Sequence, residues 1–204
     1  MTLCNMATEF SAFTGIIAPD AKTFEYLARR RYAPAAFAEP YWTSLVSDAD
    51  AVFDHEIEID AASIAPMVSW GTSPEQSIAI DALIPQGPAR AHDYIGLAAG
   101  QLLLGTPIDA AFIGSCTNSR LSDLRRAAAL VKGRHIAPGI KTALVVPGSS
   151  AVKRAAEAEG LDTVFTAAGF EWRESGCSLC FYAGGEGFVP GSRTISSTNR
   201  NFEG

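Results

Sequence analysis

The sequence predicts an α/β protein of three layers (α/β/α), with helices packed on the faces of a mostly parallel β-sheet. Two observations predict this class. From about residue 106 onward, short apolar runs that suit buried strands alternate with longer segments whose apolar residues recur at helical spacing. Gly133, Gly148 and Gly160 stand at the ends of these segments, where a chain commonly leaves a helix or strand.

Composition describes a globular protein with a substantial core. The 204 residues are 48% hydrophobic and 19% charged, with a net charge of −6, and a chain of this length buries roughly 70% of its unfolded surface. The acidic balance disfavours a nucleic-acid partner, which would favour a basic surface. No apolar run approaches the roughly 18 residues that a membrane span needs, and the start lacks a signal-peptide pattern. We therefore expect a cytoplasmic protein that binds neither nucleic acid nor membrane.

The N-terminal half has fewer regular patterns. Apolar residues recur at helical spacing from Leu3 to Phe13, which predicts a helix that Gly15 closes. Asp20 is the expected N-cap of a second helix. From Phe53 to Asp60 apolar and acidic residues alternate, which predicts a strand with a solvated acidic face rather than a row of metal ligands.

The remaining elements follow in order along the chain. A boundary within residues 100–107 would separate an N-terminal subdomain, residues 1–105, from a C-terminal one, residues 106–204. The expected elements are a strand from Met67, a helix over 89–98, a strand ending at Ile113, a helix over 121–131, a strand over 142–146, a helix over 151–160, a short helix capped by Asp162 and a last strand over 193–196.

Three of the four cysteines stand where chemistry is expected. Cys116 follows a buried strand at a strand-to-helix turn, and Cys177 and Cys180 form a CxxC pair. Open α/β folds hold their ligands at the carboxyl ends of the strands, so these thiols can converge on one site there. Three thiolates suffice to hold an iron–sulfur cluster with one iron left open. We interpret Cys4, on the apolar flank of the first helix, as a packing residue.

Three other interpretations of these cysteines compete. A thioredoxin-like dithiol would place the CxxC at a helix start directly after a strand, whereas here it follows Glu171–Ser175. Structural zinc takes a fourth protein ligand, and no histidine is near either motif in the sequence. Simple burial fits single cysteines better than a CxxC pair.

Ordered sequence blocks carry a resemblance over essentially the whole chain. Four of them resemble the aconitase superfamily in order and spacing: Gly114-Ser115-Cys116-Thr117-Asn118-Ser119, Val146-Pro147-Gly148-Ser149, Gly176-Cys177-Ser178-Leu179-Cys180 and Ser197-Thr198-Asn199-Arg200-Asn201-Phe202. Three further blocks look most like the 3-isopropylmalate dehydratase large-subunit family: Phe24-Glu25-Tyr26-Leu27, Ser69-Trp70-Gly71-Thr72-Ser73-Pro74 and Phe170-Glu171-Trp172-Arg173. The expected fold is therefore aconitase-like.

The resemblance implies a 4Fe–4S cluster as cofactor, with Cys116, Cys177 and Cys180 as its metal ligands. The iron that lacks a thiolate would bind the hydroxyl and a carboxylate of a hydroxy acid as a Lewis acid. Residues 1–105 would then line the cluster cleft, and residues 106–204 would carry its ligands.

The same resemblance implies the roles of four further residues. Arg200 would bind a substrate carboxylate, for which a planar guanidinium suits better than an ammonium, and Asn199 would lie beside the cluster. Asn5 and Glu9 match positions that line the open iron. Asn5 would then bind substrate and Glu9 would be catalytic, four residues apart on one helix face.

The implied function is that of a hydro-lyase which isomerises 2-isopropylmalate and 3-isopropylmalate in leucine biosynthesis, by dehydration and rehydration. A small swivelling-domain subunit would be its partner and would supply the catalytic base. The chain looks like the middle part of a family member, so we expect it to be inactive by itself. Aconitase or homoaconitase activity, and a non-catalytic metal-binding or redox module, are the alternatives.

Overall fold

The computed structural model describes the chain except residues 29, 34–37, 181–186 and 200–204, and gives only the backbone of Phe10, Ala38 and Cys180. The chain forms two compact units. Unit 1 comprises Met1–Thr2 and Ser63–Gly204, and unit 2 comprises Leu3–Ala62. The subdomain boundary that the sequence predicts between residues 105 and 106 falls within unit 1. It stays a prediction.

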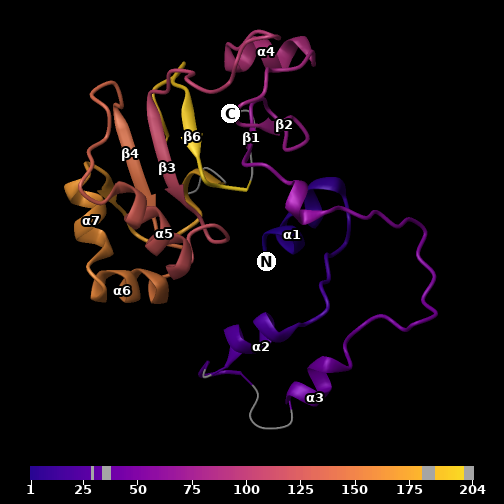
Figure 1. Cartoon of the computed structure of the whole chain (residues 1–204). Coiled ribbons are helices and arrows are strands. Elements are labelled where there is room, and N and C mark those ends of the chain that lie inside the picture. Colours follow the sequence, from indigo (N-terminus) through magenta and orange to yellow (C-terminus); the bar gives the residue numbers. More distant parts are fainter. Residues whose placement is uncertain (29, 34–37, 181–186, 200–204) are drawn as a thin grey trace. The chain divides into compact units, whose positions relative to one another are not determined.

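A four-stranded sheet forms the centre of unit 1, with strand order β5-β4-β3-β6 and every neighbouring pair parallel (Figure 1). Its strands are β3 (Ala110–Gly114), β4 (Thr142–Val146), β5 (Glu171–Trp172) and β6 (Thr194–Ser196). The predicted α/β class and parallel sheet are therefore confirmed. Parallel pairing brings the carboxyl ends of β3, β4 and β6 to one edge, where Cys116 follows β3.

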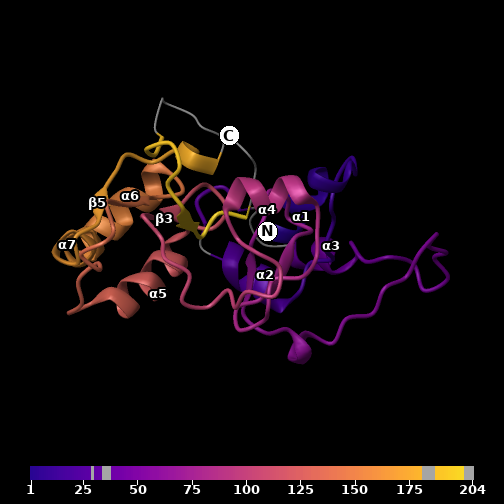
Figure 2. The same cartoon turned by 90° about the horizontal axis from the view of Figure 1, so that it is seen from above.

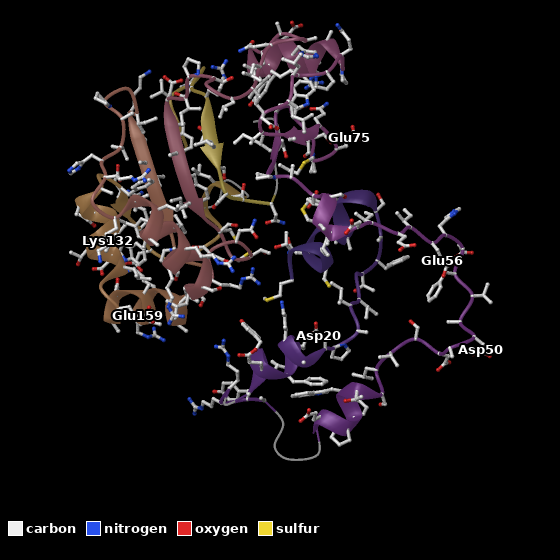
Figure 3. The ribbon with its side chains drawn as sticks, in the orientation of Figure 1. Asp20, Asp50, Glu56, Glu75, Lys132 and Glu159 are labelled. Carbon is white, nitrogen blue, oxygen red and sulfur yellow. The ribbon has the colours of Figure 1, made fainter. Side chains whose placement is uncertain are left out.

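Three helices pack against one face of this sheet (Figures 1 and 2). They are α5 (Leu121–Val131), α6 (Ser150–Ala158) and α7 (Leu161–Ala167). Their inward residues Leu124, Ala128, Ala156 and Phe165 meet Val145 of β4 in one buried cluster. An exposed ion pair links α5 to α6, with Arg125 Nε donating to Glu159 Oε2 at 2.7 Å (Figure 3).

The other face of the sheet carries a smaller apolar cluster. Phe112, Leu144 and Val146 alternate with the residues that face α5–α7, as the two-residue period of strands requires. Leu179 and Phe188 pack against these three side chains. The stretch that contains the CxxC pair therefore covers this face near the ends of β3 and β4.

A second small sheet and a helix complete unit 1. Strand β1 (Met67–Ser69) pairs antiparallel with β2 (Ser77–Ala79), and α4 spans Ala89–Ile95. The Trp70 ring stacks on the His92 ring at a centroid distance of 4.7 Å, and the Nδ1 atom of His92 lies 2.8 Å from the carbonyl oxygen of Leu97. Strand β2 is not among the elements that the sequence predicted.

Asp109 and Arg193 join the amino ends of β3 and β6. The backbone N–H of Arg193 donates to Asp109 Oδ2 at 3.0 Å, and Lys141 Nζ lies 3.0 Å from Asp109 Oδ1. The Arg193 hydrogen bond, followed by that of Lys141, lowers the pKa of the Asp109 carboxyl below its ordinary value. The Arg193 guanidinium donates to the carbonyl oxygens of Ile95 and Pro107, both at 2.9 Å, which fastens the α4 segment to the sheet.

Unit 2 contains α1 (Thr2–Met6), η1 (Ala7–Phe10), α2 (Ala21–Leu27), α3 (Ala38–Thr43) and η2 (Ala61–Ser63), where the first residue of α1 and the last residue of η2 belong to unit 1. Asp20 caps α2 as predicted, because its Oδ1 accepts from the backbone N–H of Thr23 at 2.8 Å. Two expectations are wrong. The first helical stretch ends at Phe10, where Ser11 adopts a left-handed φ of 65°, before Gly15 is reached. Residues 53–60 form no strand.

Two expected boundaries in unit 1 also shift. Helix α4 ends at Ile95 because Gly96 leaves the helix with φ 66°, three residues earlier than predicted. The N-cap of α7 is Gly160, so Asp162 lies within its first turn instead of capping it. Within the described part of the chain, no helix is both long enough and apolar enough to cross a membrane.

We expect Leu124→Ala to lower the free energy of unfolding by about 2–5 kcal/mol, because it opens a cavity in the α5 face of the core. Leu130→Ala removes the same side chain from the same helix, but Leu130 is 71% exposed whereas Leu124 is 0% exposed. The control should therefore change the unfolding free energy by less than about 0.5 kcal/mol. Urea unfolding followed by circular dichroism measures both, and equal losses would contradict this account of the core.

Candidate functional site

The loop after β3 presents Cys116 to solvent. Ser115 turns the chain with a left-handed φ of 75°, and the exposed Cys116 follows it. Its neighbours Ser115, Thr117 and Ser119 are buried, so the loop holds its hydroxyl side chains inward and its thiol outward. The hydroxyls of Ser115 and Ser119 find no hydrogen-bond partner among the described residues. Buried polar atoms in this state occur at sites that hold a further group.

Residues after β6 fix this loop. The backbone N–H of Gly114 donates to Ser197 Oγ at 3.0 Å, and Asn118 Nδ2 donates to the carbonyl oxygen of Ser197 at 2.8 Å. The backbone N–H of Ser197 in turn donates to the carbonyl oxygen of Phe112 at 3.0 Å. Thr2 adds a bond from its hydroxyl to Asn118 Oδ1 at 2.9 Å. Ser197 therefore holds the loop both before Cys116, at Gly114, and after it, at Asn118.

The end of β4 approaches the same loop through Gly148. Its backbone N–H donates to the carbonyl oxygen of Ser119 at 2.9 Å. A Cβ atom at this position would lie 2.8 Å from that oxygen and 3.2 Å from the carbonyl oxygen of Cys116. Only glycine allows the backbone to come this close. The following residue, Ser149, caps α6 by accepting from the backbone N–H of Val152 at 3.2 Å.

The CxxC pair lies on a short turn of 3-10 helix, η3 (Ser178–Cys180). Cys177 is exposed and directly precedes it, while Ser178 is buried with a left-handed φ of 46°. Leu179 anchors the turn by packing on Phe112 and its neighbours, close to the end of β3 from which Cys116 follows. Cys177 is therefore carried by a segment that packs on the sheet face to which Phe112 of β3 belongs, and Cys116 follows the same strand.

Helix α6 holds the segment that leads to Cys177. Trp172 Nε1 donates to Glu157 Oε1 at 3.0 Å, and Lys153 Nζ lies 2.9 Å from the same oxygen and 3.0 Å from Glu174 Oε1. The hydrogen bond from Lys153, followed by that from Trp172, lowers the pKa of the Glu157 carboxyl. The same two carboxylates raise the pKa of the Lys153 ammonium. These links give the CxxC segment a fixed approach to the sheet.

A cavity of about 460 Å³ lies beside the loop's anchor. Its lining includes β1, the adjoining Trp70, residues 103–106 and residues 193–198, among them Ser197. The lining combines aliphatic side chains with hydroxyls, and the buried Trp70 Nε1 and Thr106 Oγ1 have no partner among the described residues.

Comparisons with known proteins identify the family. The model of the aconitase family (aconitate hydratase) matches residues 1–204. The chain belongs to the aconitase family. It is 62% identical to the 3-isopropylmalate dehydratase large subunit of Cupriavidus necator over 100% of this chain and 81% of that protein. It is 51% identical to large subunit 1 of that enzyme from Bradyrhizobium diazoefficiens, and 52% identical to the large subunit from Synechococcus sp..

The last two relatives are much longer than this chain. Each match includes 100% of this chain but only 46% of the relative. The resemblance expected from the sequence blocks is thus confirmed, and the aconitase family is a family of iron–sulfur enzymes. Within the described residues, no group of three or more His, Cys, Asp or Glu side chains is close enough to hold a metal ion. This statement does not include the Cys180 side chain, which is not among the described side chains.

The other predicted site residues of this aconitase-family chain fall in different places. Asn199 is half-buried two residues after Ser197, and Arg200 lies outside the described residues. Asn5 belongs to α1 and Glu9 to η1, both in unit 2. The change from α-helix to 3-10 helix between them removes the regular four-residue spacing that was expected to place them on one face.

Sequence reasoning did not identify three residues that position the thiols: Ser197, Gly148 and Leu179. All three residues lie inside the sequence blocks that carry the family resemblance. Their contacts join segments far apart in the chain, so local patterns gave no sign of them.

We predict that Gly148→Ala changes the rate at which iodoacetamide alkylates Cys116 by several-fold and destabilises the protein by about 1–3 kcal/mol, because the added methyl group must displace the Ser119 carbonyl. Mass spectrometry of the peptide that contains Cys116 gives the rate. Gly139→Ala is the matched control, since a Cβ atom there meets nothing within 4 Å. An unchanged alkylation rate in Gly148→Ala would mean that this close approach does not position Cys116.

Proposed function

We propose that this chain is the cluster-binding part of a hydro-lyase that interconverts 2-isopropylmalate and 3-isopropylmalate, in the manner of 3-isopropylmalate dehydratase. The observation that supports this most strongly is that Leu179, between the two cysteines of the CxxC pair, packs on the apolar cluster that includes Phe112 of β3, the strand that Cys116 follows. The names of the relatives favour isopropylmalate over the substrates of aconitase or homoaconitase.

The proposed metal ligands are Cys116, Cys177 and Cys180, holding a 4Fe–4S cluster. Thiolates are the ligands that iron–sulfur clusters prefer. The chain fits such a group in two respects. Cys116 and Cys177 are exposed and so accessible, while the hydroxyls of Ser115 and Ser119 that flank Cys116 lack partners within the described residues. When bound, a cluster with three thiolate ligands supplies an iron whose open coordination position acts as a Lewis acid on a substrate hydroxyl.

In this proposal, residues of the chain itself orient the Cys116 loop and bind the substrate. Ser197 and Gly148 hold the backbone around Cys116, and the Cys116 thiol lies 3.6 Å from the Thr117 hydroxyl. Asn199 and Arg200 follow Ser197 by two and three residues, and this short tether supports a role for both beside the loop. Arg200 would bind a substrate carboxylate through its planar, bidentate guanidinium.

Two roles rest on the family resemblance and concern unit 2. Asn5 would bind substrate at the open iron, and Glu9 would be a catalytic residue there. A small subunit would be the protein partner and would supply the base that removes the proton from the carbon next to the hydroxyl. The name "large subunit" carried by the relatives supports such a partner.

The histidines of this chain do not provide that base in the described structure. His92 is engaged with Leu97 and Trp70, and His135 lies between α5 and β4, at the amino ends of the strands. His55 lies in unit 2 on a stretch with no regular secondary structure. The proposal therefore assigns the general base to the small subunit.

We predict that Cys116→Ser, Cys177→Ser and Cys180→Ser each sharply lower the iron and acid-labile sulfide that the protein retains after anaerobic reconstitution. The reason is that a serine hydroxyl is a poor substitute for a thiolate ligand of iron. Cys4→Ser is the control, because Cys4 lies in α1 and is expected only to pack. An equal loss of iron in the control would refute the proposed ligand set, and a zinc content instead of iron would favour a structural metal module.

We further predict that the reconstituted chain alone hydrates the unsaturated intermediate about 10²–10⁴-fold more slowly than the Synechococcus enzyme, because it lacks a positioned general base. The assay follows the ultraviolet absorbance of the intermediate, with a purified small subunit absent and then added. Addition should raise the rate. A rate near that of the Synechococcus enzyme without the small subunit would show that the proton-handling residues are in this chain.

A further inference from the structure

Asn118 connects the loop after β3 to two other segments of unit 1. Its Nδ2 atom donates to the carbonyl oxygen of Ser197 at 2.8 Å, and its Oδ1 atom accepts from the hydroxyl of Thr2 at 2.9 Å. These partners are 79 and 116 residues away along the chain. In the described part of the chain, the other side chains of residues 115–119 make no hydrogen bond to a segment outside the loop. Asn118 is therefore the side chain through which this loop is linked to its neighbours.

The chemistry of the two partners fixes which way the Asn118 amide points. A backbone carbonyl oxygen can only accept a hydrogen bond, so the group that faces Ser197 has to be the NH₂ group. The amide oxygen then faces Thr2, whose hydroxyl donates. An ionised aspartate has the same shape but no donor, and it would place a negative oxygen against the Ser197 carbonyl. This position therefore suits asparagine and not aspartate.

The start of the chain contacts this region at a second point. Arg120 Nη1 donates to the sulfur of Met1 at 3.3 Å, and Arg120 Nε donates to Asp123 Oδ2 at 3.0 Å in the first turn of α5. Two side chains from the segment between Cys116 and α5 thus hold the first two residues. Because Thr2 is also the first residue of α1, its hydrogen bond fixes the beginning of that helix at the loop.

We propose that Asn118 is a positioning residue, which fixes the segment after β6 and the start of α1 relative to the Cys116 loop. Asn199 and Arg200 follow Ser197 by two and three residues, so the hydrogen bond from Asn118 holds the chain just before them. The functional part of this inference rests on the proposed function, in which Arg200 binds the substrate and Asn199 lies beside the cluster. Asn118 does not touch the substrate in this account. It keeps the substrate-binding segment at the correct separation from the metal ligand Cys116.

The first experiment uses the chain without a cluster and measures the amide exchange of Gly114 and Ser197 by nuclear magnetic resonance. Both N–H groups donate in this network, to Ser197 Oγ and to the carbonyl oxygen of Phe112. Asn118→Asp should speed both exchange rates about tenfold, the effect expected from the loss of one hydrogen bond. Gln86→Glu adds the same charge at an exposed position and should leave both rates unchanged.

A double-mutant cycle tests whether Asn118 acts as a single link. Thr2→Val keeps the shape of the side chain but removes its hydroxyl, so the Asn118 amide is held at one end only and the same exchange should become faster. Asn118→Ala removes both hydrogen bonds, so adding Thr2→Val to it should change nothing further. Thr163→Val, at an exposed position of α7, is the matched control. Unchanged exchange in Asn118→Asp, or an equal effect of Thr2→Val with and without Asn118, would overturn the proposal.

The second experiment uses the chain after anaerobic reconstitution, with the small subunit added. Binding of 3-isopropylmalate is followed through the electron paramagnetic resonance spectrum of the reduced cluster. Asn118→Asp should retain iron and acid-labile sulfide within about twofold of the unaltered chain but bind 3-isopropylmalate about tenfold more weakly, because the substrate-binding segment is misplaced.

Two results would contradict the positioning role in substrate binding. They are a loss of iron as large as that in Cys116→Ser, and unchanged binding of 3-isopropylmalate. An unaltered chain that holds no cluster would instead contradict the proposed function. In that case the exchange rates of Gly114 and Ser197 still decide whether Asn118 is the link, because they are measured without a cluster.

Discussion

The candidate site depends on one close approach, that of the backbone at Gly148 to the loop after β3. Its N–H reaches the carbonyl oxygen of Ser119, and the room for this contact exists only because the residue lacks a Cβ atom. Ser197 holds the other side of the loop through Gly114 and Asn118. Cys116 is thus held from the ends of β4 and β6 while its own side chain stays exposed, as the proposed role of a metal ligand requires.

Packing extends this constraint to the second thiol segment. Leu179 packs against Phe112, Leu144 and Val146, on the sheet face that α5–α7 do not cover. The apolar residue between the two cysteines of the CxxC pair thus anchors the segment that presents them. The Lys153–Glu174 ion pair is weakly stabilising because the Glu174 side chain is 88% exposed, whereas Leu179 is partly buried against the apolar cluster.

The two units differ in how much apolar surface they bury. Unit 1 has a continuous core that includes Leu124, Val145 and Phe165, all fully buried. In unit 2, Ala7 is the buried apolar side chain among those the structure describes, whereas Phe13 and Ile57 are exposed. Burial of apolar area is the main favourable term in folding. Among the described residues, burial of apolar side chains therefore stabilises unit 1 more than unit 2.

Local patterns in the sequence determined much of the fold. Apolar runs located β3 and β4, helical spacing of apolar residues located α5, and Asp20 was identified as an N-cap. These features depend on neighbours within a few residues, so the sequence contains them. The sequence blocks also indicated the aconitase family, which the family match confirms.

Only the tertiary structure decided how the thiol segments are held. Ser197 and Gly114 are 83 residues apart, and nothing in either local sequence marks their hydrogen bond. The burial of His92 against Trp70 was equally invisible. Residues 53–60 are the opposite case, in which the sequence predicts a strand that the structure does not contain. Their alternation specifies which side chains share a face, but a strand exists only where a second strand satisfies its backbone, and the described fold places none beside them.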